Sequence, residues 1–184
     1  MPPEPLNRFQ KIDIFFKVVT AIGVAIAAFT LHQTHEWNRR QFSMVVLGNY
    51  TKDIGAAAKI LTAKYQGLYQ KDLAGSLLPV DADKLFKANA KDNPEEFALR
   101  SAIMDYLNYM EYVCAAYENQ TVDQATIEEL YGGLFKRRYK FFREFIVVGR
   151  REVGEGAWAP IERVVGSWET KGYPALKKSK RTGW

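Results

Sequence analysis

The stretch IDIFFKVVTAIGVAIAAFTL, from Ile12 to Leu31, decides the fold of this chain. At 1.5 Å rise per residue, a helix of about 20 residues spans roughly 30 Å, the thickness of a bilayer core. Nothing else in the sequence is as long and as apolar. The run therefore predicts one transmembrane helix, whose membrane-spanning side chains are Ile14, Phe15, Phe16, Val18, Val19, Ile22, Val24, Ile26, Phe29 and Leu31.

Two charged residues interrupt the first turns of this run. Asp13 and Lys17 are four residues apart, so they share a helix face and can pair. Lys17 can also extend its ammonium toward the headgroups. The uninterrupted part, 18–31, is about 14 residues long and also fits a buried core helix. Ala25-Ile26-Ala27 resembles a signal-peptide cleavage site. The transmembrane helix is the favoured interpretation, with a core helix and a signal peptide as its alternatives.

The composition predicts one ordinary domain in addition to the anchor. The chain has 184 residues, of which 47% are hydrophobic and 26% charged, which is enough apolar material for a core. The single cysteine, Cys114, excludes an internal disulfide. It falls in an apolar helical stripe, where we expect a buried, inert thiol.

The net charge of +5 is concentrated in clusters. Such clusters on an anchored protein suit anionic lipid, and a solvated helix face with a solubilising tail is the equal alternative. No nucleic-acid motif accompanies them, so we expect no nucleic acid as partner. The candidate interface and lipid residues are Trp37, Arg39, Arg40, Lys136, Arg137, Arg138, Lys140, Lys177, Lys178, Lys180 and Arg181.

Charge also predicts the orientation of the anchor. Both flanks of the apolar run are mildly basic, with Arg8 and Lys11 before it and Arg39-Arg40 after it. The short arm before the run also contains Glu4, whereas the basic domain follows the run. The positive-inside rule then places the residues after 35 in the cytoplasm. We expect a single-pass membrane protein, with most of the chain cytoplasmic.

The rest of the chain reads as helical, and strand signals are scarce. No proline occurs from Leu6 to Leu78, so the apolar run can continue into a long juxtamembrane helix. Beyond it, apolar residues recur in steps of three and four. The predicted fold is all-α: one N-terminal transmembrane helix, a juxtamembrane helix and a small helical bundle. The expected parts are 1–35 (arm and transmembrane helix), 36–72 (juxtamembrane helix), 73–170 (bundle) and 171–184 (basic tail).

Turn and capping signals divide the predicted bundle. A break over 72–83 precedes a short helix over 83–90. Asp92-Asn93-Pro94 predicts the start of the next helix, and Asp123 or Thr121 caps the one after it. Three glycines predict a loop before a final helix that holds Trp158 and Trp168; they are Gly149, Gly154 and Gly156.

No motif predicts catalysis, a cofactor or a metal. His32 and His35 share a helix face, but no further ligand pattern supports a metal site. Glu95-Glu96 and Glu128-Glu129 fall in the first turns of predicted helices, where carboxylates complement the helix dipole. We therefore expect a protein that is not an enzyme and has no cofactor.

Several short motifs lie between Tyr106 and about Val165. They are Leu107-Asn108-Tyr109-Met110-Glu111, Arg138-Tyr139, Phe145-Ile146, Arg150-Arg151, Trp158 and Ile161-Glu162. Together they resemble an uncharacterised bacterial membrane family, known only as a domain of unknown function. The resemblance implies one N-terminal span in a bacterial inner membrane, followed by a helical cytoplasmic domain, and no activity. Glu111 is expected to pair with Arg150-Arg151 between helices.

The favoured function is protein–protein interaction by a membrane-anchored, non-catalytic chain, as an accessory or structural subunit of a larger membrane complex. The tyrosines and phenylalanines of 106–145 exceed what one helix face can bury, which hints at protein contacts. An anionic-lipid-binding module is the alternative, and an enzyme with an unrecognised site is the second alternative.

Overall fold

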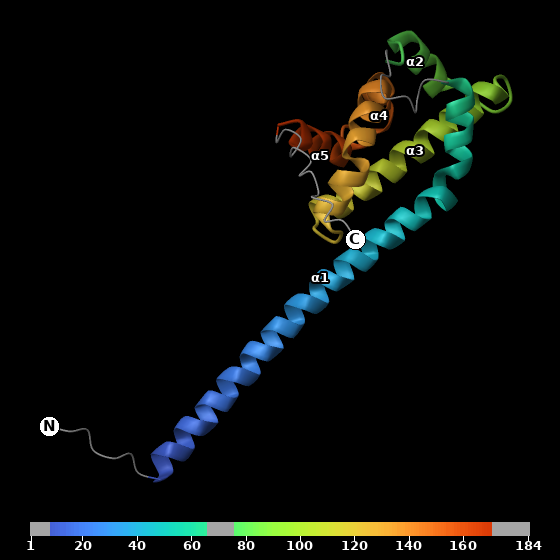
Figure 1. Cartoon of the computed structure of the whole chain (residues 1–184). Helices are drawn as coiled ribbons and strands as arrows, with labels where there is room; N and C mark the ends of the chain where they lie inside the picture. Colours follow the sequence, from blue (N-terminus) through green and yellow to red (C-terminus); the bar gives the residue numbers. More distant parts are fainter. Residues whose placement is uncertain (1–7, 66–75, 171–184) are drawn as a thin grey trace, which may run out of the picture. The chain divides into compact units, whose positions relative to one another are not determined.

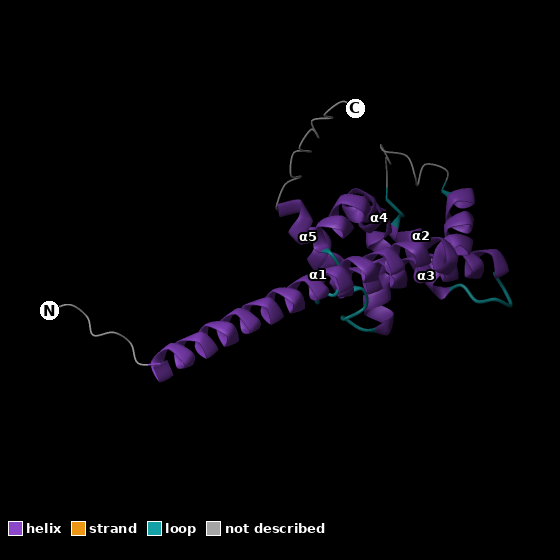
Figure 2. Ribbon diagram, turned by 60° about the horizontal axis from the view of Figure 1, so that its bottom comes forward, coloured by secondary structure: helices purple, strands orange, loops and turns teal. Residues whose placement is uncertain are grey.

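A computed structural model describes residues 8–65 and 76–170, and within them the chain is all helical. The result confirms the predicted fold class, a long N-terminal apolar helix followed by a helical bundle (Figures 1 and 2). The described residues form α1 (Arg8–Lys64), α2 (Pro79–Lys87), α3 (Pro94–Glu118), α4 (Gln124–Val153) and α5 (Ala159–Thr170).

The chain divides into two compact units, 1–41 and 42–184, and α1 contributes to both. In the first unit, α1 carries the apolar run. The segment Ile12–Val46 is long and apolar enough to cross a membrane, with a mean hydropathy of 2.2 over 18 residues. None of that window is buried inside the protein. The run is therefore not a core helix of this chain.

In the second unit, the last part of α1 packs on the bundle along one face. Val46, Ile54, Ala57 and Leu61 are buried, at the spacing that the sequence predicts for a helical stripe. Their spacing turns one side of the helix to the core, whereas the run before them is exposed all round. Along its length, α1 thus changes from a helix that is apolar on all sides to one with a single buried apolar face.

Hydrogen bonds fix this part of α1 to α3 and α4. The Tyr109 hydroxyl donates to the Val46 carbonyl at 3.0 Å and lies 3.2 Å from the Tyr131 hydroxyl. The Ser43 hydroxyl accepts from the Asp123 backbone N–H at 2.7 Å. Because Asp123 is also the N-cap of α4, Ser43 links α1 directly to the start of that helix.

Aromatic rings fill the core where α3, α4 and α5 meet. Phe135 and Phe142 from α4 are fully buried, together with Trp168 from α5. The Trp168 ring meets the Tyr117 ring of α3 edge-on, with centroids 5.2 Å apart. Offset and edge-to-face ring pairs stabilise such a core beyond their buried area. The predicted buried state of Cys114 is confirmed.

Two helix starts refine the predictions. The Asp123 carboxylate accepts from the Thr126 N–H at 2.8 Å, so Asp123 caps α4. Thr121 instead donates its hydroxyl to the Ala116 carbonyl. The short helix α2 begins at Pro79, four residues before the predicted start at Asp83. Proline is favoured in the first turn of a helix, so Pro79 starts the helix and does not belong to the preceding break.

The prediction that Gly149 belongs to a loop is wrong. It lies in α4 and is buried, and a Cβ built on it would collide with the Trp158 ring and come within 3.3 Å of Phe86. The missing side chain makes room for that indole. Gly154, whose φ is 138°, ends the helix instead, because glycine alone adopts that backbone conformation freely.

Gly149→Ala is expected to destabilise the bundle by about 1–3 kcal/mol, because the new methyl must displace the buried Trp158 ring. The matched control is Gly166→Ala in α5, where no atom lies within 4 Å of the new Cβ and helix propensity adds roughly 0.5–1 kcal/mol. Urea unfolding of the full chain in mild detergent measures both. A Gly149→Ala variant as stable as the wild type would contradict the close packing.

Candidate functional site

The predicted membrane-spanning side chains are all exposed. Each of the ten, from Ile14 to Leu31, keeps between 46% and 71% of its surface accessible. They belong to one helix and cover every side of it. Isolated apolar side chains on a surface are ordinary, but a continuous apolar helix surface of this length needs a cover. A bilayer or a partner protein is the kind of environment that supplies one.

Four polar side chains on this part of α1 have partners within the helix. The Lys17 ammonium lies 2.6 Å from the Asp13 carboxylate, which confirms the predicted pair. The Thr30 and Thr34 hydroxyls donate to the carbonyls one turn back, at 2.9 and 2.8 Å. The helix therefore presents few polar groups that need water, as a lipid environment requires.

The predicted interface residues of α1 follow directly after the run. The Trp37 side chain is 60% exposed, and it lines a shallow hollow of about 440 Å³ with Arg40 and Glu36. Arg39 is half-buried and Arg40 is exposed. An exposed tryptophan beside arginines is typical of the level of the headgroups. Their contact with lipid stays a prediction.

The basic residues predicted on α4 do not form one exposed patch. Arg138 is fully buried, its guanidinium 5.8 Å from the centre of the Tyr106 ring, to whose hydroxyl its Nε donates over 3.4 Å. Lys136 donates to the Trp168 carbonyl at 2.7 Å, in the last turn of α5. Arg137 is half-buried, and Lys140 is exposed. Lys136 and Arg138 thus take part in packing the bundle. Lys136 stabilises the end of α5, because a cation near a helix C-terminus is favourable, and Arg138 packs against Tyr106 in the core.

The basic tail residues Lys177, Lys178, Lys180 and Arg181 lie outside the described residues. Their proposed contact with lipid stays a prediction.

Ion pairs join the helices, although not the pair that the sequence predicts. The Arg150 guanidinium binds Glu162 at 2.6 Å, joining α4 to α5. Arg151 binds Asp83 at 2.7 Å, joining α4 to α2. The expected pairing of Arg150 and Arg151 with Glu111 is therefore wrong, because closer carboxylates on α2 and α5 occupy them.

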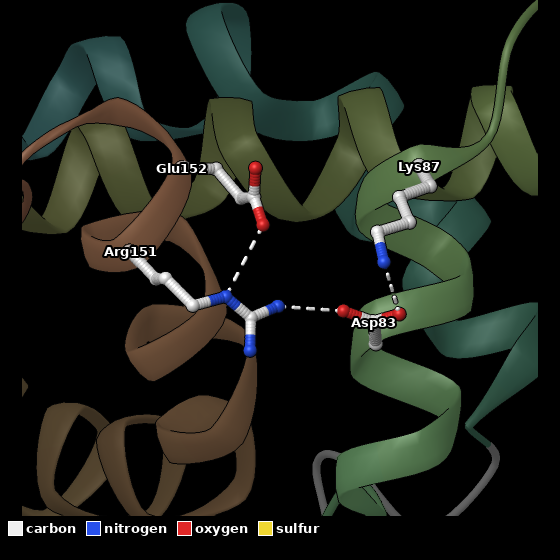
Figure 3. Close-up of polar contacts among 4 residues, drawn as sticks. All are labelled: Asp83, Lys87, Arg151 and Glu152. Atoms are coloured by element: carbon white, nitrogen blue, oxygen red, sulfur yellow. Dashed lines mark hydrogen bonds and ion pairs between the residues drawn. The ribbon is translucent and has the colours of Figure 1, made fainter.

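The Asp83 carboxylate is the centre of a small network (Figure 3). Lys87 donates to one of its oxygens at 2.7 Å and Arg151 to the other, while Glu152 binds the Arg151 Nε at 3.2 Å. The Lys87 hydrogen bond, followed by that of Arg151, lowers the pKa of Asp83 below its ordinary value. This network is open to solvent, so it orients α2 on α4 more than it stabilises the fold.

One member of each carboxylate pair flagged in the sequence has a structural partner. Glu96 binds Lys84 at 2.5 Å, and the Glu128 carboxylate accepts from the Tyr117 hydroxyl at 3.3 Å. Burial raises the pKa of the Cys114 thiol, so this cysteine is not a nucleophile at neutral pH. Within 8–65 and 76–170, no three His, Cys, Asp or Glu residues gather to hold a metal ion.

The sequence interpretation missed a hollow of about 500 Å³ between α1 and α3. It is lined by Ile54 from α1 and by Asp105, Asn108, Tyr109 and Tyr112 from α3. The signal was present in the spacing: 105, 108 and 112 share a helix face that lies off the apolar stripe. Tyr112 lies on this outward face and is exposed, unlike the buried tyrosines of the core.

Comparison with known proteins yields one match. The sequence profile of a family described as a domain of unknown function (DUF4760) matches residues 17–168. No curated protein and no solved structure matches the chain. The match begins inside the apolar run and ends at the last core residue of α5, so it covers the helices of both units.

Lys136→Met is expected to destabilise the bundle by about 1 kcal/mol, because the substitution removes a charge-assisted hydrogen bond to the end of α5 and keeps the aliphatic stem. Lys140→Met, one turn further along the same helix and exposed, should stay within about 0.5 kcal/mol of the wild type. Thermal and urea unfolding measure both variants. Equal effects of the two substitutions would contradict the structural role of Lys136.

Stability should also depend on pH through Glu162, whose pKa the Arg150 hydrogen bond lowers below the ordinary value of 4.5. A lowered folded-state pKa contributes stability above the ordinary pKa, and that contribution is lost as the pH falls through the lowered value. Because half of the side chain is exposed, the contribution should be only a few tenths of a kcal/mol.

Urea unfolding of the wild type and of Glu162→Gln tests this dependence. The two should differ most at pH 7 and converge once the pH falls below the lowered pKa of Glu162, where the carboxylate is protonated. Glu155→Gln, an exposed acid in the loop after α4, serves as the control and should follow the wild type. A difference between wild type and Glu162→Gln that grows toward low pH would contradict the assignment.

Proposed function

We propose that this chain, which belongs to the family of the domain of unknown function DUF4760, is a non-catalytic, membrane-anchored helical protein. It acts by binding other proteins, as an accessory or structural subunit of a larger membrane complex. The observation that carries the proposal is the apolar run of α1, none of which is buried within the chain. That surface is long, continuously apolar and exposed.

The energetics of insertion support a membrane-spanning role for this run. At the centre of a transmembrane helix, Leu, Ile, Phe and Val each contribute roughly 0.3–0.6 kcal/mol, whereas a charged residue costs roughly 2.5–3.5 kcal/mol. The segment 18–31 contains no charged residue. Asp13 and Lys17 lie in the turns before it and pair with each other, which limits their cost.

The proposal includes a location and an orientation. The membrane is the inner membrane of a bacterium, and the chain after residue 35 lies in the cytoplasm. Arg39 and Arg40 support this orientation, because basic residues just after a span favour the cytoplasmic side.

Two features of the bundle favour a protein partner over a lipid surface. Lys136 and Arg138 are engaged in the packing of α4, so they do not add to a surface for anionic headgroups. In contrast, Tyr112 is 52% exposed beside a hollow, and tyrosine is among the residues that contribute most to protein interfaces. The bundle thus offers a built surface for protein contact.

Val24→Arg should release the chain from the membrane, since it places a charge at the centre of the run at a cost of roughly 2.5–3.5 kcal/mol. After alkaline carbonate extraction, the wild type should stay in the membrane pellet and the variant should move toward the supernatant. Leu130→Arg, at an exposed position of the bundle, is the matched control and should stay in the pellet.

The same preparation tests the subunit role. Purified in gentle detergent, the wild-type chain should migrate in a complex larger than its own 21.0 kDa plus the detergent micelle. The membrane anchor would be contradicted if alkaline carbonate extracted the wild-type chain completely, or if the mature chain began after Ala27. A chain that is only monomeric in gentle detergent would contradict the subunit role.

A further inference from the structure

We propose that the hollow between α1 and α3 is the docking site for an arginine side chain presented by a partner protein. This inference rests on the proposed function, since it names where the partner binds and by which chemistry. The hollow has a volume of about 500 Å³ and is lined by Ile54, Asp105, Asn108, Tyr109 and Tyr112. All five residues belong to the second unit of the chain.

The inner walls of the hollow are held in place by the fold. Ile54 is only 2% exposed and provides an apolar floor. The Tyr109 hydroxyl points away to the Val46 carbonyl, so its ring forms a wall. The Asn108 carbonyl oxygen accepts from the Trp158 indole N–H at 2.9 Å, which orients the amide and leaves its NH₂ group as a donor. Such preorganised walls lower the entropic cost of binding.

The rim supplies a charge that the fold leaves without a counterion. Asp105 is exposed, and no described residue forms an ion pair or hydrogen bond with its carboxylate. The α3 segment 101–118 contains no lysine or arginine that could pair with it along the helix. The other two acids of this segment do not line the hollow, and one of them, Glu118, is bound by Arg163 through two hydrogen bonds of 2.7 Å. The hollow therefore carries a single carboxylate without a counterion, that of Asp105.

Arginine fits these groups better than other side chains. Its guanidinium can donate two parallel hydrogen bonds to the Asp105 carboxylate and stack on the exposed Tyr112 ring. The Asn108 NH₂ group suits a backbone carbonyl next to that arginine. An anionic side chain would meet Asp105 as a like charge. An apolar one would bury the carboxylate without a partner, which costs more than burying a neutral polar group without one.

A defined probe tests the chemistry on the full chain in mild detergent. N-acetyl-arginine methylamide should shift the backbone amide resonances of residues 105–112, and the shifts should weaken in high salt. N-acetyl-norleucine methylamide, which has no charge, should produce no comparable shifts. Asp105→Asn should abolish the arginine response, whereas Glu129→Gln, an exposed acid on α4, should preserve it. An arginine response that is absent, or that survives in Asp105→Asn, overturns the proposal.

The native complex tests the same site with the partner present. In gentle detergent, Asp105→Asn and Tyr112→Ala should each weaken the complex at least tenfold, while Asp105→Glu retains it. Leu130→Ala is the control, because Leu130 is exposed to a similar extent as Tyr112 and lies on α4. Unchanged thermal unfolding of each variant excludes loss of the fold.

These experiments separate the two proposals. A complex that persists in both Asp105→Asn and Tyr112→Ala overturns the docking site and leaves the subunit role standing. A wild type that forms no complex overturns the subunit role, and the arginine titration then decides whether the hollow binds a guanidinium.

Discussion

The constraint on which the structure depends is that α1 is a single helix with two different surfaces. From Ile12 to Leu31 its side chains are apolar on every side and exposed, whereas from Val46 to Leu61 only one side is buried. Nothing in 8–64 breaks the helix, since it contains no proline. The backbone hydrogen bonds of the helix therefore continue from the exposed run into the part that packs on the bundle. The difference between the two surfaces of α1 comes from their side chains alone.

The bundle compensates for a modest interface with α1 by using specific polar contacts. Tyr109 bonds to the Val46 carbonyl and Ser43 to the start of α4, so two different helices hold α1 at neighbouring turns. Such hydrogen bonds contribute only about 1 kcal/mol each, but they are directional and fix the rotation of α1 about its axis. The rotation decides which residues line the hollow beside Asp105.

The sequence predicted features that depend on local chemistry and missed those that depend on tertiary contacts. The cap at Asp123 and the buried stripe through Ile54 follow from side chains within a few turns, and both were predictable. The burial of Arg138 was not, because it depends on the Tyr106 ring of another helix. The sequence pattern likewise predicts a loop at Gly149, because only the packed Trp158 ring explains a glycine within the helix.

The same distinction explains why charge counts are a poor guide to partners here. The sequence places four basic residues within 136–140, yet the structure commits Lys136 to the end of α5 and Arg138 to the core. In contrast, α3 leaves the Asp105 carboxylate exposed at the hollow, which the net charge of +5 does not reveal. A surface is recognised by the groups that the fold leaves exposed, and beside the hollow these are the Asp105 carboxylate and the Tyr112 ring. That combination favours a basic segment of another protein over an anionic lipid as the partner of the bundle.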